Sequence, residues 1–147
     1  MCCAHRLPRL ALAQTADQVL TALYKHSLKH GFQVYAYCVM PDHFHAFVSG
    51  LYANSNLLAF IKNFKQTTAR QYRKQFGTEL WQKKFHERVL RSGVNADAVS
   101  GYIWLNPVRS GLCGTPQEYP FSGSFVVDWK KAFLPNEIWV PDWKRTR

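Results

Sequence analysis

The first half of the chain contains three segments with clear apolar spacing. In residues 16–30, apolar side chains recur three and four positions apart, which predicts a helix with one buried face. Residues 32–40, FQVYAYCVM, are rich in aromatic and β-branched side chains, and residues 43–50, HFHAFVSG, follow a Pro-Asp turn. These two segments therefore predict adjacent strands of one β-hairpin.

The second half predicts further helices and strands. Residues 55–76 predict a long helix with basic side chains outside its apolar stripe, and residues 85–90 alternate enough to predict a strand. A shorter helix is expected over about 96–105, because Pro107 must end it. A small strand is expected at 124–127, within an otherwise irregular tail that covers 125–147.

The order of these elements predicts an α+β fold. With a short opening strand at residues 2–6, the chain has the βαββαβ order of a ferredoxin-like sandwich, an antiparallel sheet with helices on one face. The length of 147 residues fits a single domain over 1–147.

The charge of the chain is strongly positive and unevenly distributed. Nineteen Lys and Arg residues against nine Asp and Glu give a formal charge of +10, and residues 51–100 alone contain nine basic and three acidic side chains. Hydrophobic residues make up 47% of the chain, which excludes intrinsic disorder. The middle third is therefore expected to face a polyanion such as nucleic acid.

Membrane and secreted classes are not favoured by the sequence. No stretch approaches the ~20 apolar residues needed to span a bilayer, and the first residues lack a signal-peptide pattern. The cysteines, Cys2, Cys3, Cys38 and Cys113, show no Cys-x-x-Cys spacing. We expect a cytoplasmic protein with free thiols and no membrane partner.

Basic residues on the long helix and after it are candidates for binding DNA phosphates. They are Lys62, Lys65, Arg70, Arg73, Lys74, Lys83, Lys84 and Arg88. Tyr72 and Trp81 are candidates for stacking on unpaired bases. The alternative for any single member is a plain solvated helix face.

His43 and His45 flank Phe44 in a predicted strand. Side chains two positions apart leave the same face of a strand, so the two imidazoles can converge on one divalent cation while Phe44 enters the core. The alternative is a half-buried pair of histidines on an edge strand, because a metal needs more than two ligands.

Tyr102 and Asn106 lie four positions apart on the predicted helix and share one face of it. The amide oxygen of Asn106 is a hard ligand that suits Mg²⁺ or Mn²⁺. The alternative makes Tyr102 a core aromatic residue and Asn106 the residue that ends the helix.

Four segments together resemble one known family. YAYCVMPDHFHAFV, WQKKFHERVLR, YIWLNPVRSGL and YPFSGS resemble the REP-associated tyrosine transposases, a branch of the single-tyrosine HUH (His-hydrophobic-His) transposases, over about residues 15–124. The resemblance implies a ferredoxin-like fold with the histidines on a central strand. It also implies that His43, His45 and Asn106 bind the metal and that Tyr102 is the nucleophile.

The same resemblance implies a reaction and a partner. Such an enzyme is an endonuclease and recombinase of mobile DNA that nicks and rejoins single-stranded or hairpin DNA from palindromic repeats, through a 5′-phosphotyrosyl intermediate. It would work in the bacterial cytoplasm, at the nucleoid, as a monomer or a homodimer.

Other functions remain open from the residues alone. One is a domesticated or inactive nucleic-acid-binding module of the same fold, and a weaker one is a metal-dependent hydrolase that shares only His-x-His. Tyr72 is the reserve nucleophile, and His86 is expected to be structural or to face solvent.

Overall fold

The computed structural model describes residues 1–85, 87–90, 93–131 and 140. Its elements are η1 (Ala4–Arg6), α1 (Ala13–His30), β1 (Phe32–Met40), β2 (His43–Gly50), α2 (Leu57–Phe76), α3 (Ala96–Trp104), α4 (Asn106–Arg109), η2 (Pro116–Glu118) and β3 (Ser122–Gly123). The three main helices and the two strands of the β-hairpin confirm the predicted elements to within a few residues. Asn56 and Asn95 define two helix starts, because each side chain accepts backbone N–H groups of the first turn.

The sheet is antiparallel and has the strand order β2-β1-β3. The register of the β-hairpin runs from Met40 opposite His43 to Phe32 opposite Gly50, with an irregularity between Val34 and Ala36. An irregularity of this kind changes which face later side chains point to.

The opening strand expected at residues 2–6 is shorter than predicted, because η1 begins at Ala4, and only residues 1–3 extend the sheet on the other side of β2. The Phe44 N–H donates to the Met1 carbonyl (2.7 Å), and the Gln82 N–H donates to the Cys2 carbonyl (3.0 Å). Single antiparallel bridges join Cys2 to His43 and Cys3 to Trp81. The start of β2 therefore lies between β1 and the N-terminal residues, which in turn pair with the segment around Trp81. This order of neighbouring segments is that of the predicted ferredoxin-like fold.

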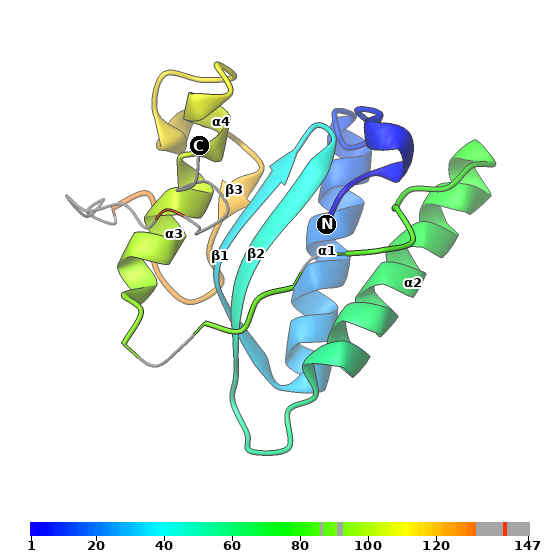
Figure 1. Cartoon of the computed structure of the whole chain (residues 1–147). Helices are drawn as coiled ribbons and strands as arrows, with labels where there is room; N and C mark the ends of the chain where they lie inside the picture. The colour runs from blue at the N-terminus through cyan, green and yellow to red at the C-terminus, as the bar shows by residue number, and fades with distance from the viewer. Residues whose placement is uncertain (86, 91–92, 132–139, 141–147) are drawn as a thin grey trace.

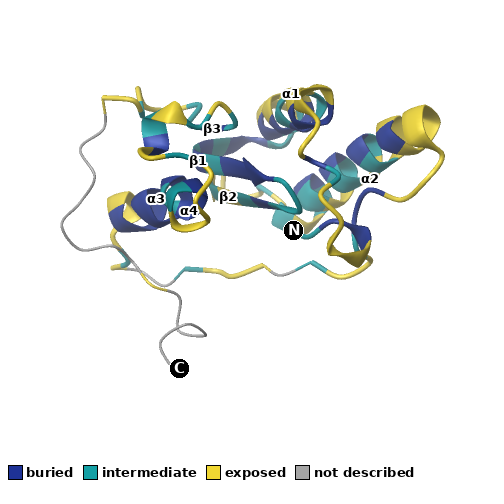
Figure 2. Ribbon diagram, turned by 90° about the horizontal axis from the view of Figure 1, so that it is seen from above, coloured by how far each residue is buried: buried dark blue, intermediate teal, exposed yellow. Residues whose placement is uncertain are grey.

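The helices cover both faces of the sheet (Figures 1 and 2). The two crossover helices, α1 and α2, lie on one face as expected, and α3 lies on the other. The first core includes Val19, Leu23, Val34, Phe44, Phe60 and Phe64. The second core includes Ala36, Cys38, Met40, Val99, Tyr102 and Ile103.

The strand predicted at residues 85–90 is wrong for the described residues of that segment, which are irregular. Among the described residues between α2 and α3, the bridge of Trp81 to Cys3 is the only sheet pairing. Directly after it, the Lys65 ammonium binds the carbonyls of Gln82 (2.5 Å) and Lys83 (3.0 Å), so these acceptors face α2. Val89, in the middle of this segment, is 81% exposed.

The small strand predicted at 124–127 is wrong, because the strand of this region is β3 and ends at Gly123. The Ser124 hydroxyl accepts the N–H groups of Val126 (3.0 Å) and Val127 (3.1 Å), which makes a turn there. The Trp104 indole N–H donates to the Gly123 carbonyl (3.0 Å) and so fixes α3 against β3. Residues 132–139 and 141–147 of the expected tail lie outside the described residues.

None of the described helices is both long and apolar enough to cross a bilayer. The four cysteines are free, and Cys3 and Cys38 are buried. Burial raises the pKa of each of these two thiols to about 11.

Candidate active site

The histidine pair lies on the α3 face of the sheet. Phe44, between the two histidines, packs into the α1–α2 core, and Phe47 packs into the α3 core. Alternation along β2 therefore places His43 and His45 on the side of Phe47. Their ring centroids are 4.9 Å apart and the ring planes are nearly perpendicular, at 88°.

Asp42 orients the first histidine. His43 Nδ1 lies 2.5 Å from one carboxylate oxygen of Asp42, and Arg6 Nε lies 3.2 Å from the other. Burial raises the pKa of Asp42, but the hydrogen bond and charge of His43 and the charge of Arg6 outweigh it, so this pKa lies below its usual value. An imidazole whose Nδ1 donates to a carboxylate presents Nε2 to a ligand.

Tyr102 and His45 line the same cavity. It has a volume of about 650 Å³ and extends from α1 and α2, where Leu23 and Phe60 line it, past β2 to the segment after Phe85 and to α3. Tyr102 is only 6% exposed, and its side chain forms part of the cavity wall. Tyr102 also belongs to the α3 core with Phe47, so the predicted nucleophile lies on the face of the sheet toward which His45 points. His43 and Asn106 are not among the described residues that line the cavity.

Asn106 is the buried first residue of α4, and its amide nitrogen already donates two hydrogen bonds. Pro107 has no N–H, so the Ile103 carbonyl lacks its usual helical donor. The Asn106 amide donates to the carbonyls of Ile103 (3.1 Å) and Tyr102 (3.2 Å). Because both partners are acceptors, the amide oxygen is the end that can take a cation.

Arg109 is a site residue that the sequence analysis missed. Its guanidinium lies 4.3 Å from the centre of the Tyr102 ring and donates to the Tyr102 carbonyl (2.6 Å). Burial lowers the pKa of Arg109, against the opposing effects of Tyr102 and Cys38. The signal was present in the sequence, because residues 102, 106 and 109 have the i, i+4, i+7 spacing of one helix face.

Most of the predicted DNA-binding residues are exposed. These are Lys62, Arg70, Arg73, Lys74, Lys83, Lys84 and Arg88. Arg88 also lines the cavity with His45 and Tyr102. Lys65 differs, because its ammonium is held by backbone carbonyls and desolvation lowers its pKa.

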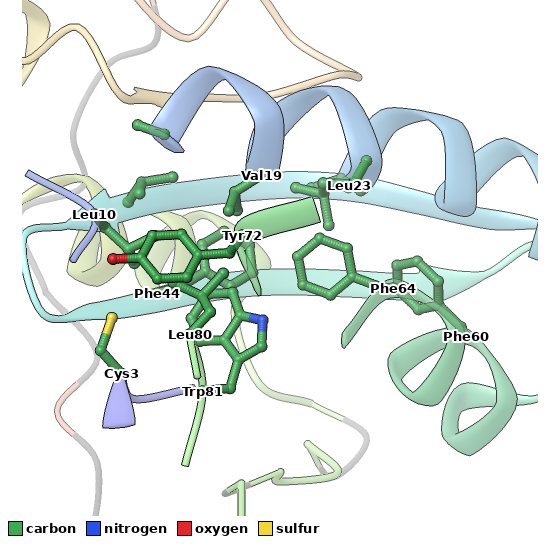
Figure 3. Close-up of a cluster of buried hydrophobic side chains, with 14 of the residues drawn as sticks. Cys3, Leu10, Val19, Leu23, Phe44, Phe60, Phe64, Tyr72, Leu80 and Trp81 are labelled. Atoms are coloured by element: carbon green, nitrogen blue, oxygen red, sulfur yellow. The ribbon is translucent and has the colours of Figure 1, made fainter. Parts of the chain in front are cut away.

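The two aromatic candidates for base stacking are core residues, so that expectation is wrong. Tyr72 is 6% and Trp81 is 5% exposed, and both point into the core beside Phe44 and Phe64 (Figure 3). The Trp81 indole donates to the Thr68 hydroxyl (2.8 Å). Tyr72 lies in the core on the side of the sheet opposite the histidines, so the structure does not support it as the reserve nucleophile.

The donors present suit a divalent cation. Among the described residues, no group of three or more His, Cys, Asp or Glu side chains is placed to hold a metal ion. Besides the two imidazoles, the Asn106 amide oxygen is the donor of another type that the predicted ligand set contains. Two imidazoles and one amide oxygen form a mixed set that Mn²⁺ or Mg²⁺ accepts. His86 lies outside the described residues.

Comparison with known proteins identifies the family. The model of the family described as IS200-like transposases matches residues 1–105. A Haemophilus influenzae protein named as a REP-associated tyrosine transposase is 30% identical over 126 residues, which covers 78% of this chain and 71% of that protein. The REP-associated tyrosine transposase of Escherichia coli K12 is 25% identical over 131 residues, which covers 82% of this chain and 77% of that protein.

A solved structure has the same fold. It is a REP-associated tyrosine transposase bound to a REP hairpin, and it superposes with a TM-score of 0.66 at 22% identity, over 81% of this chain and 69% of the other. The match of the family model extends over the histidine pair and Tyr102. The chain belongs to the IS200-like transposase family.

Proposed function

We propose that this protein is a metal-dependent transposase that nicks and rejoins single-stranded or hairpin DNA, with Tyr102 as the nucleophile. The observation that carries the proposal is that His45 and Tyr102 line one cavity and that Tyr102 packs in the α3 core beside Phe47, on the face of β2 to which His45 belongs. The names of the two relatives support transposase activity. The DNA hairpin in the solved relative supports the class of substrate.

His43, His45 and Asn106 would hold the metal. Their donor atoms are the Nε2 atom of His43, a ring nitrogen of His45 and the amide oxygen of Asn106. When bound, a divalent cation supplies Lewis-acid polarisation of a phosphoryl oxygen and offsets the charge that develops there. Asp42 and Arg6 keep the His43 ring in the orientation that this binding needs.

Tyr102 would attack the scissile phosphate. A bond forms between the Tyr102 oxygen and phosphorus, and the bond from phosphorus to the 3′-oxygen breaks. The phenol proton leaves to solvent, and the departing 3′-oxygen takes up a proton as the free 3′-hydroxyl. One phosphodiester replaces another, so a second 3′-hydroxyl can reverse the step on a new strand without another energy source.

The exposed basic residues of α2 and of the following segment would hold the DNA backbone. Residues 51–100 contain nine basic and three acidic side chains, and the charged groups of this segment are mostly exposed. Arg88 lies on the cavity wall, where a phosphate would approach Tyr102. Each phosphate contact should steepen the salt dependence of binding by about 0.7 log unit for single strands and ~0.9 for duplex DNA.

The proposal is tested by trapping the covalent intermediate. The protein is incubated with Mn²⁺ and a labelled DNA hairpin that has single-stranded flanks, and the products are separated under denaturing conditions. We expect a protein–DNA adduct in the wild type and in the control Tyr24→Phe, since Tyr24 is half-exposed on α1, and none in Tyr102→Phe.

Two other outcomes would contradict parts of the proposal. An adduct that persists in Tyr102→Phe would show that another residue is the nucleophile. A wild type that binds the DNA hairpin but forms no adduct would identify the protein as a binding module that does not cut.

A further inference from the structure

We propose that Arg109 is the positioning residue for Tyr102, which it contacts at the ring and at the backbone so that the ring is held in one orientation. The inference rests on the proposed role of Tyr102 as the nucleophile. It adds Arg109 to the site and assigns it the orientation of the Tyr102 ring, on the basis of the contacts between α3 and α4.

Arg109 makes two contacts to one residue. The guanidinium carbon lies 4.3 Å from the centre of the Tyr102 ring, within the range of a cation–π interaction. A terminal nitrogen of the same group donates to the Tyr102 carbonyl at 2.6 Å. One planar group thus contacts both the side chain and the main chain of Tyr102, which a compact lysine ammonium cannot reproduce.

The local backbone brings Arg109 to this position. The chain turns at Leu105, where φ is −80° and ψ is −6°, and continues as the short helix α4. Pro107 removes one backbone donor at this junction, and Asn106 replaces it. The helical direction is nearly kept, so Arg109 lies two turns beyond Tyr102 on the same face.

The Arg109 guanidinium has Tyr102 as its main partner. Among the ion pairs recorded for the described part of the chain, none involves Arg109. Its ionisable neighbours there are Tyr102 and Cys38, and Cys38 is a buried thiol of β1. Because a guanidinium stays protonated at neutral pH, the contact persists over the pH range in which the protein works.

A fixed ring matters because the attack needs a defined geometry. A phenol that rotates freely about its side-chain bonds would spend little time aligned with the phosphorus atom. The rate of the chemical step would therefore be lower. Binding of the DNA depends mainly on the exposed basic side chains, which are distant from this contact along the chain. Loss of Arg109 should therefore slow adduct formation and leave the affinity for DNA nearly unchanged.

The test compares Arg109→Met and Arg109→Lys with a matched control, Arg9→Met. Arg9 lies over another tyrosine ring, 5.8 Å from the centre of the Tyr72 ring in the α1–α2 core. At saturating DNA, we expect Arg109→Met to form the adduct at least about tenfold more slowly, with a Kd for the DNA hairpin within about twofold of wild type. Arg109→Lys should recover part of the rate, and Arg9→Met should retain all of it.

A spectroscopic measurement tests the contact without the reaction. In protein labelled with 3-fluorotyrosine, the Tyr102 resonance is identified by its loss in Tyr102→Phe. We expect this ¹⁹F resonance to shift in Arg109→Met and to remain in place in Arg9→Met. Should the methionine variant fail to fold, the same measurements on Arg109→Lys decide the question.

Three results would overturn the proposal. The first is an unchanged rate of adduct formation in Arg109→Met. The second is a loss of DNA affinity in this variant as large as its loss of rate, which would indicate that Arg109 contacts a phosphate. The third is an unchanged Tyr102 resonance in the same variant. If the wild type forms no adduct, the proposed function fails, and the ¹⁹F shift alone then decides whether Arg109 positions Tyr102.

Discussion

The Nδ1 atom of His43 lies 2.5 Å from a carboxylate oxygen of Asp42, the residue immediately before it. Arg6 holds the other oxygen of this carboxylate at 3.2 Å and also donates to the sulfur of Cys2 at 2.8 Å. Three side chains behind the histidine thus fix the direction of its ring. Carboxylates in this position orient ligating histidines in many metal sites.

Replacement of Asp42 should weaken metal binding. In Asp42→Ala the His43 ring loses its partner, so we expect the affinity for Mn²⁺ to fall by about 10–100-fold, the usual effect of losing such a group. Titration calorimetry of the DNA-free protein with Mn²⁺ measures this directly. The control is Asp17→Asn on the exposed face of α1, which should bind Mn²⁺ as the wild type does. Equal affinities in Asp42→Ala and wild type would contradict the orienting role.

Removal of either imidazole should separate cutting from binding. His43→Ala and His45→Ala should form no adduct, because each lacks one of the proposed metal ligands, while their salt-dependent affinity for the DNA hairpin stays close to that of wild type. His5→Ala, at an exposed histidine, is the control for both assays. If both variants instead unfold and lose DNA binding together, the histidines are core residues.

Lys65 and Lys62 should behave differently, although both are basic residues of α2. Lys65→Met removes the donor to the carbonyls of Gln82 and Lys83, so we expect it to lower the free energy of unfolding by about 1–2 kcal/mol. Lys62→Met, at an exposed position, should leave stability unchanged and reduce the salt slope of DNA binding by ~0.7–0.9. Urea unfolding and binding at several salt concentrations measure the two quantities. The same stability loss in both variants would refute the structural role of Lys65.

Trp81→Phe should affect stability and not DNA binding. The variant keeps most of the buried apolar surface but loses the hydrogen bond to Thr68, so the free energy of unfolding should fall by about 1–2 kcal/mol. Because the indole is buried, the Kd for the DNA hairpin should stay within about twofold of wild type. A large loss of affinity in a variant of normal stability would restore the base-stacking interpretation of Trp81.

Acid should destabilise the contact between α1 and α2 through His26. This ring contacts the Thr67 hydroxyl at 3.0 Å, and its pKa is lowered first by burial and then by the charges of His30 and Lys29. As pH falls through the usual value of 6.5, the unfolded chain takes up a proton that the folded chain does not, so stability decreases. Urea unfolding between about pH 8 and pH 5 should show a smaller decrease in His26→Gln than in the wild type. Identical pH profiles would exclude this contribution.

The local pattern of apolar and polar residues was sufficient to predict most of the helices and strands. The strands of the β-hairpin and α3 lie where composition, a turn and Pro107 placed them, because neighbouring residues determine these features. Alternation along β2 also predicted that Phe44 and the two histidines occupy opposite faces, and the structure confirms this. The roles of the histidines, Tyr102 and Asn106 stay predictions.

What sequence reasoning missed depends on contacts between distant segments. An aromatic residue next to basic ones can stack on a base or fill a core, and only the fold shows that Trp81 does the latter. Likewise, nothing near Lys65 in the sequence indicates that its ammonium binds carbonyls of the next segment. Arg109 was accessible in principle, because its spacing from Tyr102 and Asn106 is that of one helix face.

The pairing of residues 1–3 with β2 has a consequence for folding kinetics. The Met1 amine binds the Phe44 carbonyl across 43 positions of sequence, and the Ala4 N–H reaches further, to the Leu80 carbonyl. Contacts of such separation form only after large loops close, which slows folding. The strand that bears both imidazoles therefore acquires its second neighbour late, so the proposed metal ligands reach their final arrangement only at the end of folding.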